Sequence, residues 1–275
     1  MSCLACGLEV PSYARSCPSC GKDCGFPNVR SADAQDEVAR LQSRVDAAHV
    51  SAKARGCFDE LIEFGENVKT SKAVISRPLA KIHELLSNER TSYVSFQKEV
   101  NSGARQAEDN EFDKVRKQYE EALFPHFSAE IIFALLSLTE AGMVGYGTHT
   151  MTLKDKMIGH RSTVFEENPH NFVEKHGIVL NQPIPPGYRA SWGSRHDLAM
   201  AKLHSRIDSA TEKAHHANII ATDNGGSGNS DWIEVHIYGS INRNAIENVS
   251  GPKPKLKADQ VIWQSIQETL KSLSS

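Results

Sequence analysis

Long apolar runs are absent from this sequence. No stretch approaches the roughly 18 consecutive apolar residues of a membrane-spanning helix. The N-terminus, MSCLACGLEV, also lacks the basic start and apolar middle of a secretory signal. We therefore expect a cytoplasmic protein with no membrane partner. With 39% hydrophobic and 24% charged residues among 275, the chain is globular and long enough for one larger domain with appendages.

A strong net charge is also missing. The formal charge is -3 and the isoelectric point is near 6.5, so the chain as a whole does not attract nucleic acid. Affinity for a polyanion would have to come from a local basic surface. The sequence has neither a GxSxG nucleophile elbow nor a HExxH pair, which disfavours serine hydrolases and zinc proteases. Many histidines lie in the second half, so a histidine-based nuclease stays an alternative.

Cysteine is scarce beyond the first 24 residues, where only Cys57 occurs. That distribution disfavours a disulfide scaffold, and Cys57 is interpreted as a small buried hydrophobic residue. Within the first 24 residues, CLACG and CPSCG form two CxxC pairs, each followed by glycine. Two such turns supply four thiolates to one tetrahedral Zn²⁺, so residues 1–30 are predicted to form a structural zinc ribbon. The expected ligands are Cys3, Cys6, Cys17 and Cys20, with Cys24 as an alternative to Cys20.

The rest of the chain divides by composition into two parts. Residues 34–124 are rich in helix-forming residues with apolar positions three and four apart, which predicts a helical bundle or coiled-coil arm. Such an arm suits a dimer or another protein partner. Residues 125–275 are expected to form an α+β domain, in which the apolar segment 127–144 is a buried helix under the sheet. From residue 145 onward, Gly, Thr, His, Pro and Asn accumulate, and this is the predicted catalytic region.

The segment DWIEVHIYGSI, residues 231–241, has the alternation of a strand. Successive side chains point to opposite faces, so Glu234 and His236 share a face with Trp232 and Tyr238. This pattern suits a solvated sheet face or the wall of a cleft for a flat polar ligand. A carboxylate among aromatic residues on a central strand is costly unless it is paired or used. Glu234 is therefore the first candidate for a catalytic residue.

Two separated stretches resemble a known family. The stretch YGTHTMTLKDKMIGHRST and the later DWIEVHIYGSINRNAIENV resemble ADP-ribosyltransferase-like domains of bacterial polymorphic toxins and phage-associated proteins. The two stretches lie near the ends of a region of about residues 140–250, which they frame. The residues that carry the first match are Tyr146, Gly147, Leu153, Lys154, Arg161 and Thr163.

The resemblance implies a split β-sheet domain that uses NAD⁺ as substrate. It implies that Glu234 stabilises the charge that develops when the nicotinamide–ribose bond breaks, and that Trp232 forms a wall against the nicotinamide. The chain departs from the family pattern at Trp232, two residues before Glu234, where many transferases carry Gln or Glu. Further NAD⁺-binding residues implied by the resemblance are Tyr146, Thr148, His149, Arg161 and Thr163, with Arg161 as the pyrophosphate partner.

The resemblance and the ribbon together suggest a toxin or anti-phage effector. The expected acceptor of ADP-ribose is a macromolecule, with RNA or DNA favoured over protein, and an antitoxin is a further candidate partner. The alternative from another class is a recruitment protein without enzymatic activity, in which the ribbon and the arm bind a partner and the last domain is a degenerate scaffold. A change of thermal stability with NAD⁺ would separate the two, since a ligand that binds only the folded state stabilises it.

Overall fold

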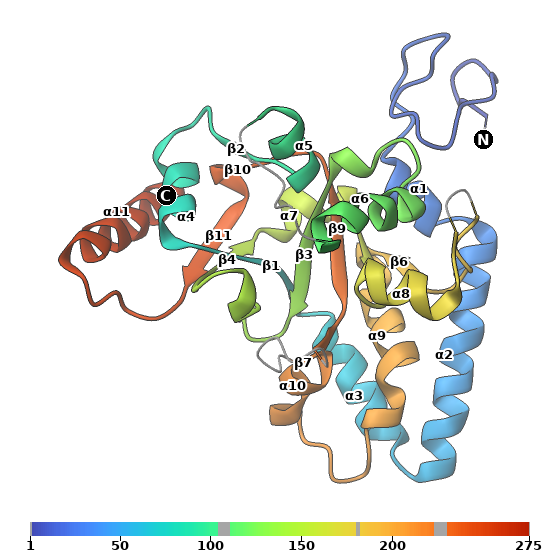
Figure 1. Ribbon diagram of the computed structural model, residues 1–275. Coiled ribbons are helices and arrows are strands. Elements are labelled where there is room, and N and C mark those ends of the chain that lie inside the picture. Colours follow the sequence, from blue (N-terminus) through green and yellow to red (C-terminus); the bar gives the residue numbers. More distant parts are fainter. Residues whose placement is uncertain (1, 104–110, 180–181, 223–229, 275) are drawn as a thin grey trace.

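The structure is a computed structural model, and it describes residues 2–103, 111–179, 182–222 and 230–274. It combines helices with a central antiparallel sheet, as the α+β prediction requires (Figure 1). Across the sheet the seven strands are β11 (Ile246–Ser250), β4 (His149–Leu153), β1 (Lys72–Arg77), β3 (Ile131–Ser137), β9 (Glu234–Tyr238), β5 (Ser162–Phe165) and β6 (Arg189–Ser191). Two short pairs accompany it, β2 (Ser92–Tyr93) with β10 (Ile241–Asn242) and β7 (Ala221–Thr222) with β8 (Asp231–Trp232).

The register of the strands assigns side chains to the two faces of the sheet. Glu234 lies opposite Leu135 of β3 and Phe165 of β5, and Leu135 in turn lies opposite Val74 of β1. Directly opposed residues of an antiparallel sheet point to the same side. Glu234 therefore shares its face with these neighbours, while the alternate residues, such as Val235, point to the other face.

Helices cover both faces. Their bounds are α1 (Pro27–Ala32), α2 (Gln35–Arg55), α3 (Phe58–Val68), α4 (Leu79–Ser87), α5 (Phe96–Asn101), α6 (Glu111–Leu123), α7 (Asp155–Ile158), α8 (Pro169–His176), α9 (Arg195–Leu203), α10 (His216–Ile220) and α11 (Lys257–Ser274). The larger core joins α2, α3, α4, α9 and α11 to the Val235 face. A smaller aromatic core lies on the Glu234 face, where Phe124 and Phe172 pack near α6 and α8.

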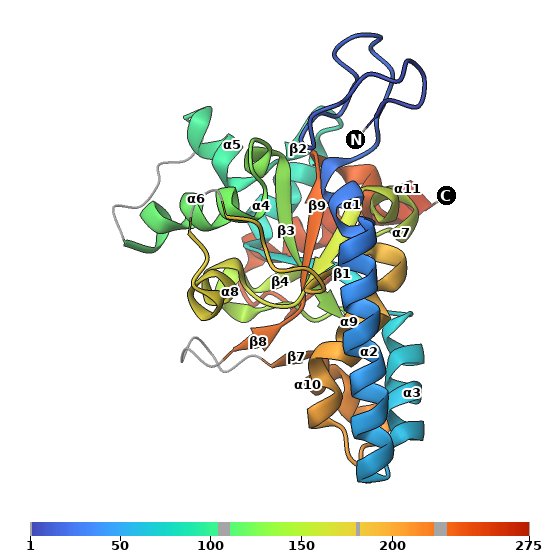
Figure 2. The same ribbon diagram turned by 90° about the vertical axis from the view of Figure 1, so that its right-hand side faces the viewer.

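The long helix α2 is part of this core rather than of a separate arm. It lies beside α3 and α9 in both views (Figures 1 and 2), and it buries Leu41, Val45 and Ala48. It ends at Gly56, which has the left-handed φ of 70° that glycine adopts without strain. The helix therefore braces one face of the sheet.

The predicted helical segment 34–124 is wrong at residues 72–77, which form strand β1 inside the large sheet. The predicted buried helix over 127–144 is also wrong, because Ile131–Ser137 forms strand β3. Both strands are short apolar runs that are buried on both faces, so no alternation marks them as strands. The sheet is continuous rather than split.

The N-terminal residues form a small module that projects from the body (Figure 1). Arg30 of α1 anchors it, because its guanidinium donates to four main-chain carbonyls of the module, those of Ser12, Ala14, Cys24 and Gly25. No helix in the described part of the chain is both long and apolar enough to cross a membrane.

Candidate functional site

A cavity of about 740 Å³ opens on the Glu234 face of the sheet. Strands β1, β3 and β9 supply its floor, and residues from α4, α6 and α8 supply its walls. Its lining includes three of the residues predicted from sequence, Tyr146, Trp232 and Glu234. A cavity of this volume is within the usual range for small-molecule sites, about 300 to 1,000 Å³.

Glu234 is 5% exposed, and its carboxylate is held by three side chains. Oε1 accepts hydrogen bonds from the indole N–H of Trp232 at 3.2 Å and from the amide of Asn168 at 3.3 Å. Oε2 lies 3.0 Å from Nε2 of His236. A carboxylate accepts about four hydrogen bonds, so Oε2 retains capacity for one more donor. The group is therefore fixed in orientation and still able to bind a hydroxyl.

His236 is a direct partner of this carboxylate. Its ring is 2% exposed and packs against three aromatic rings, with centroids 4.9 Å from Phe124, 4.9 Å from Phe133 and 5.5 Å from Phe165. Such packing removes rotational freedom from the imidazole. His236 therefore orients Glu234 from outside the cavity lining.

Tyr146 lines the cavity but does not belong to a strand of the sheet. It belongs to a 3₁₀ turn, Val144–Tyr146, and strand β4 begins three residues later at His149. Half of its side chain is exposed. Desolvation by the cavity wall, followed by the negative charge of Glu234, raises the pKa of the Tyr146 phenol. The phenol is thus a neutral hydrogen-bonding group that lies in the field of the carboxylate.

Two arginines that sequence reasoning missed also line the cavity, Arg77 and Arg116. Arg77 is the last residue of β1, and its guanidinium donates to the Tyr93 hydroxyl and to the Ser76 carbonyl. Arg116 of α6 donates to Glu120 at 2.6 Å. Both come from the segment interpreted as a helical arm, and no local motif marks either of them. Asn168, at the start of α8, was missed as well, because no local motif marks it either.

His149 does not reach the cavity. It is not among the residues that line the cavity, and its side chain is turned toward α11. There its ring packs 5.2 Å from Trp263, and Nε2 lies 3.1 Å from the Pro252 carbonyl. Thr148 bonds to Nδ1 of this ring at 2.9 Å. The predicted ligand role of both residues is therefore not supported by their position.

Arg161 and Thr163 also lie outside the cavity lining. The Arg161 guanidinium donates to the main-chain carbonyls of Met157 and Tyr238, and burial lowers its pKa. It ties a turn to the end of β9 instead of facing the cavity. Thr163 is 2% exposed and lies opposite His236 in the register. It therefore packs beside the imidazole, one residue pair removed from Glu234.

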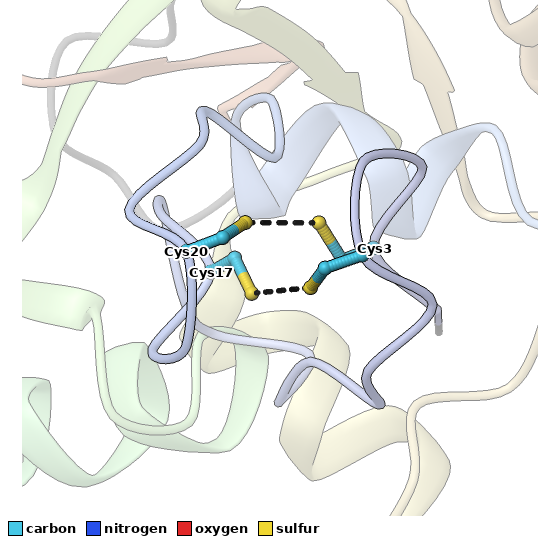
Figure 3. A group of neighbouring side chains, drawn as sticks. Cys3, Cys17 and Cys20 are labelled. Atoms are coloured by element: carbon cyan, nitrogen blue, oxygen red, sulfur yellow. Dashed lines mark hydrogen bonds between the residues drawn. The ribbon is translucent and has the colours of Figure 1, made fainter.

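The second candidate site is the cysteine cluster of the N-terminal module. The four sulfurs of Cys3, Cys6, Cys17 and Cys20 all lie within 4.8 Å of one another. Sulfurs that share one tetrahedral Zn²⁺ at about 2.3 Å are about 3.8 Å apart. The Cys3–Cys20 and Cys6–Cys17 distances are 3.7 and 3.6 Å (Figure 3). The four residues are thus placed to bind a metal ion, as predicted.

The two halves of the module are built alike. In each, the glycine after the CxxC pair has a left-handed φ, 74° at Gly7 and 69° at Gly21, and its amide donates to the carbonyl of the first cysteine. The amides of Ala5 and then Cys6 stabilise the thiolate of Cys3 and lower its pKa to about 6. Thiolates are the form that binds Zn²⁺.

The remaining cysteines are not part of the cluster. Cys24 is outside the group of four, and its thiol donates to the Lys22 carbonyl at 3.5 Å. The alternative in which Cys24 replaces Cys20 is therefore not supported. Cys57 is buried and donates to the Ile207 carbonyl at 3.3 Å.

Comparison with known proteins adds no family assignment. No protein-family model matches the sequence, and no curated protein matches it significantly. The class is defined by the molecule itself. It is an α+β protein with a buried carboxylate that makes three hydrogen bonds at the wall of a cavity, and with a four-cysteine cluster able to hold a metal.

Proposed function

We propose that the protein is an NAD⁺-dependent ADP-ribosyltransferase in which Glu234 is the catalytic carboxylate. The observation that supports this most is the geometry of Glu234, which is 5% exposed, lies at the wall of a 740 Å³ cavity and is held by Trp232, Asn168 and His236. A rigid carboxylate of this kind stabilises developing positive charge without reorganisation.

The proposed reaction breaks the bond between nicotinamide and ribose. Nicotinamide leaves with the bonding electron pair, and C1′ of the ribose becomes oxocarbenium-like. Glu234 stabilises this centre and accepts a hydrogen bond from a ribose hydroxyl at the remaining position on Oε2. A lone pair of the acceptor then forms the new bond to C1′, and the acceptor loses its proton to solvent.

The cavity offers groups that suit the rest of the dinucleotide. Arg77 and Arg116 line it, and guanidinium groups bind phosphate oxygens in pairs. Tyr146 and Trp232 add aromatic surface against which a nicotinamide ring can pack. The two guanidinium groups and the two aromatic rings are what support a ligand that combines a pyrophosphate with a flat ring.

The N-terminal module is proposed to be a zinc ribbon with a structural role. Four cysteines around one Zn²⁺ leave no position for water, so such a site stabilises a fold and does not catalyse. Its residues lie apart from the cavity lining. We propose that the module helps to bind a macromolecular acceptor, with RNA or DNA favoured over protein, as in a toxin or an anti-phage effector.

The test is an assay with NAD⁺ labelled in the ADP-ribose part, offered together with protein, DNA and RNA acceptors. We expect label on an acceptor, or release of nicotinamide, and we expect Glu234→Gln to abolish both. Glu268→Gln is the matched control, because Glu268 is an exposed residue of α11 far from the cavity lining. Absence of turnover in the wild-type protein with all three acceptors would contradict the proposal.

A recruitment protein without enzymatic activity is the second candidate. One observation favours it, the full exposure of Leu4, at 104%, together with Leu8, at 46%, on the N-terminal module. Exposed apolar residues are typical of partner surfaces. Thermal unfolding with and without NAD⁺ distinguishes the candidates, because only a protein that binds NAD⁺ is stabilised by it.

A further inference from the structure

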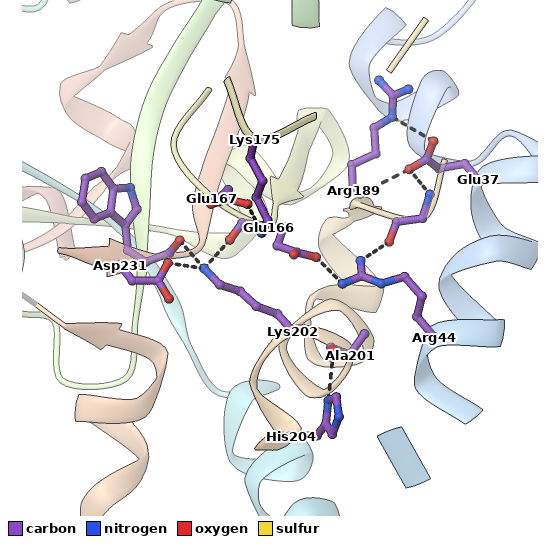
Figure 4. A network of polar contacts seen from close by, with 12 residues as sticks. Glu37, Arg44, Glu166, Glu167, Lys175, Arg189, Ala201, Lys202, His204 and Asp231 are labelled. Atoms are coloured by element: carbon purple, nitrogen blue, oxygen red, sulfur yellow. Dashed lines mark hydrogen bonds and ion pairs between the residues drawn. The ribbon is translucent and has the colours of Figure 1, made fainter. Parts of the chain in front are cut away.

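The ammonium group of Lys202, on α9, lies next to the main chain of Trp232, a residue that lines the cavity. Its side chain is 9% exposed. The Nζ atom lies 2.5 Å from the Glu166 carbonyl, 2.5 Å from a carboxylate oxygen of Asp231 and 2.9 Å from the Trp232 carbonyl (Figure 4). An ammonium has three N–H donors, so all of them are used on these three oxygens.

These contacts join three parts of the chain. Glu166 directly follows β5, Lys202 is on α9, and Asp231 with Trp232 forms β8, which leads into the strand of Glu234. The Trp232 peptide is fixed through its carbonyl, while its indole N–H donates to Oε1 of Glu234 at 3.2 Å. The orientation of the indole therefore depends on the ammonium at the other side of the same residue.

Stability alone does not account for a lysine at this position. Burial lowers the pKa of Lys202, although the Asp231 carboxylate acts in the opposite direction. Replacing a buried charge pair by apolar side chains of similar volume is often neutral or stabilising. Asp231 would also keep a cationic partner without Lys202, because it pairs with Arg206. The lysine is instead suited to fix the direction of the neighbouring peptide.

We propose that Lys202 is a positioning residue for Glu234, acting through the Trp232 peptide and its indole hydrogen bond. Only the expected change in kcat and KM rests on the proposed function; the expected change in the indole hydrogen bond does not. The loss of this support leaves the carboxylate free to rotate away from the reacting ribose. We expect kcat to fall by a larger factor than KM rises, since Arg77 and Arg116, the proposed partners of the pyrophosphate, stay in place.

The test compares Lys202→Met, which keeps the length of the side chain, with Lys175→Met. Lys175 is the matched control because its ion pair with Glu167 is exposed on the same side of the molecule. Two readouts are used, the NMR signal of the Trp232 indole N–H, assigned with Trp232→Phe, and steady-state kinetics with NAD⁺. We expect Lys202→Met to shift the indole signal and to lower kcat about tenfold, and Lys175→Met to change neither.

A folded Lys202→Met protein with an unchanged indole signal would overturn the inference. If this variant does not fold, Asp231→Asn takes its place, since it removes the charge of the single charged acceptor among the three and keeps the shape. An indole shift in a protein that shows no turnover even as wild type would support the positioning role and reject the proposed function. The failures of the two ideas are thereby distinguishable.

Discussion

The amide nitrogen of Asn28 lies 3.1 Å from the main-chain carbonyl of His236, and it also lies 3.0 Å from the carbonyl of Arg161. Asn28 is 1% exposed and sits in α1, directly after the N-terminal module. One side chain thus donates to two carbonyls, one directly before β5 and one within β9. The module is tied in this way to the strand that carries Glu234.

The first prediction follows from this contact. Asn28→Ala removes a donor from the buried His236 carbonyl and from the part-buried Arg161 carbonyl, so we expect the free energy of unfolding to fall by about 1 to 3 kcal/mol. Urea unfolding followed by circular dichroism measures the change. Asn218→Ala is the control, because Asn218 is exposed on α10, and we expect an effect within about 0.5 kcal/mol there. Equal losses in both variants would show that the Asn28 bonds do not contribute.

The second prediction concerns the metal. Purified protein is expected to contain one Zn²⁺ per chain, and Cys20→Ser is expected to lose it, because the four sulfurs around one ion are all required for tight binding. Cys24→Ser is the matched control and is expected to keep the metal. Elemental analysis by mass spectrometry gives the stoichiometry. Retention of zinc by Cys20→Ser with loss from Cys24→Ser would reverse the assignment of the fourth ligand.

The third prediction separates two arginines that the sequence does not distinguish. Arg77 lines the cavity, whereas Arg161 donates to main-chain carbonyls. We expect Arg77→Ala to raise the KM for NAD⁺ by at least about tenfold, as for the loss of a charged hydrogen bond. Arg161→Ala is expected to lower thermal stability and to leave KM unchanged below its unfolding temperature. A rise of KM in Arg161→Ala alone would restore the pyrophosphate role expected from sequence.

These comparisons show which parts of the site can be predicted from sequence. The cluster of four cysteines can, because CxxC turns are local and their geometry depends on few residues. The placement of Glu234 can as well, since its strand alternates and the period of two fixes the face. Its neighbours Trp232 and His236 follow from the same alternation, and both contact the carboxylate.

The other residues of the site depend on long-range pairing. Arg77 reaches the cavity only because β1 pairs with both β3 and β4, and a short run of buried residues does not reveal those partners. The surroundings of His149 could not be predicted either, because they depend on the pairing of β4 with β1 and with β11.

The last prediction concerns pH and a histidine far from the cavity. His216 is fully buried against Phe64, and its Nδ1 accepts from the Asn67 amide at 3.1 Å. Burial lowers the pKa of His216, and the nearby Glu63 acts in the opposite direction with a smaller effect. The unfolded chain therefore binds a proton at His216 more readily than the folded chain does.

This difference fixes the sign of the pH dependence. Above about pH 6.5 the histidine is neutral in both states and does not change stability. Below that pH the unfolded state gains the proton first, so the free energy of unfolding decreases by up to about 1.4 kcal/mol per pH unit until the folded-state pKa is reached. We expect His216→Gln to flatten this part of the stability profile, and the exposed His215→Gln to keep it. Urea unfolding between pH 5 and pH 8 provides the measurement, and an equally steep profile in His216→Gln would exclude His216 as its source.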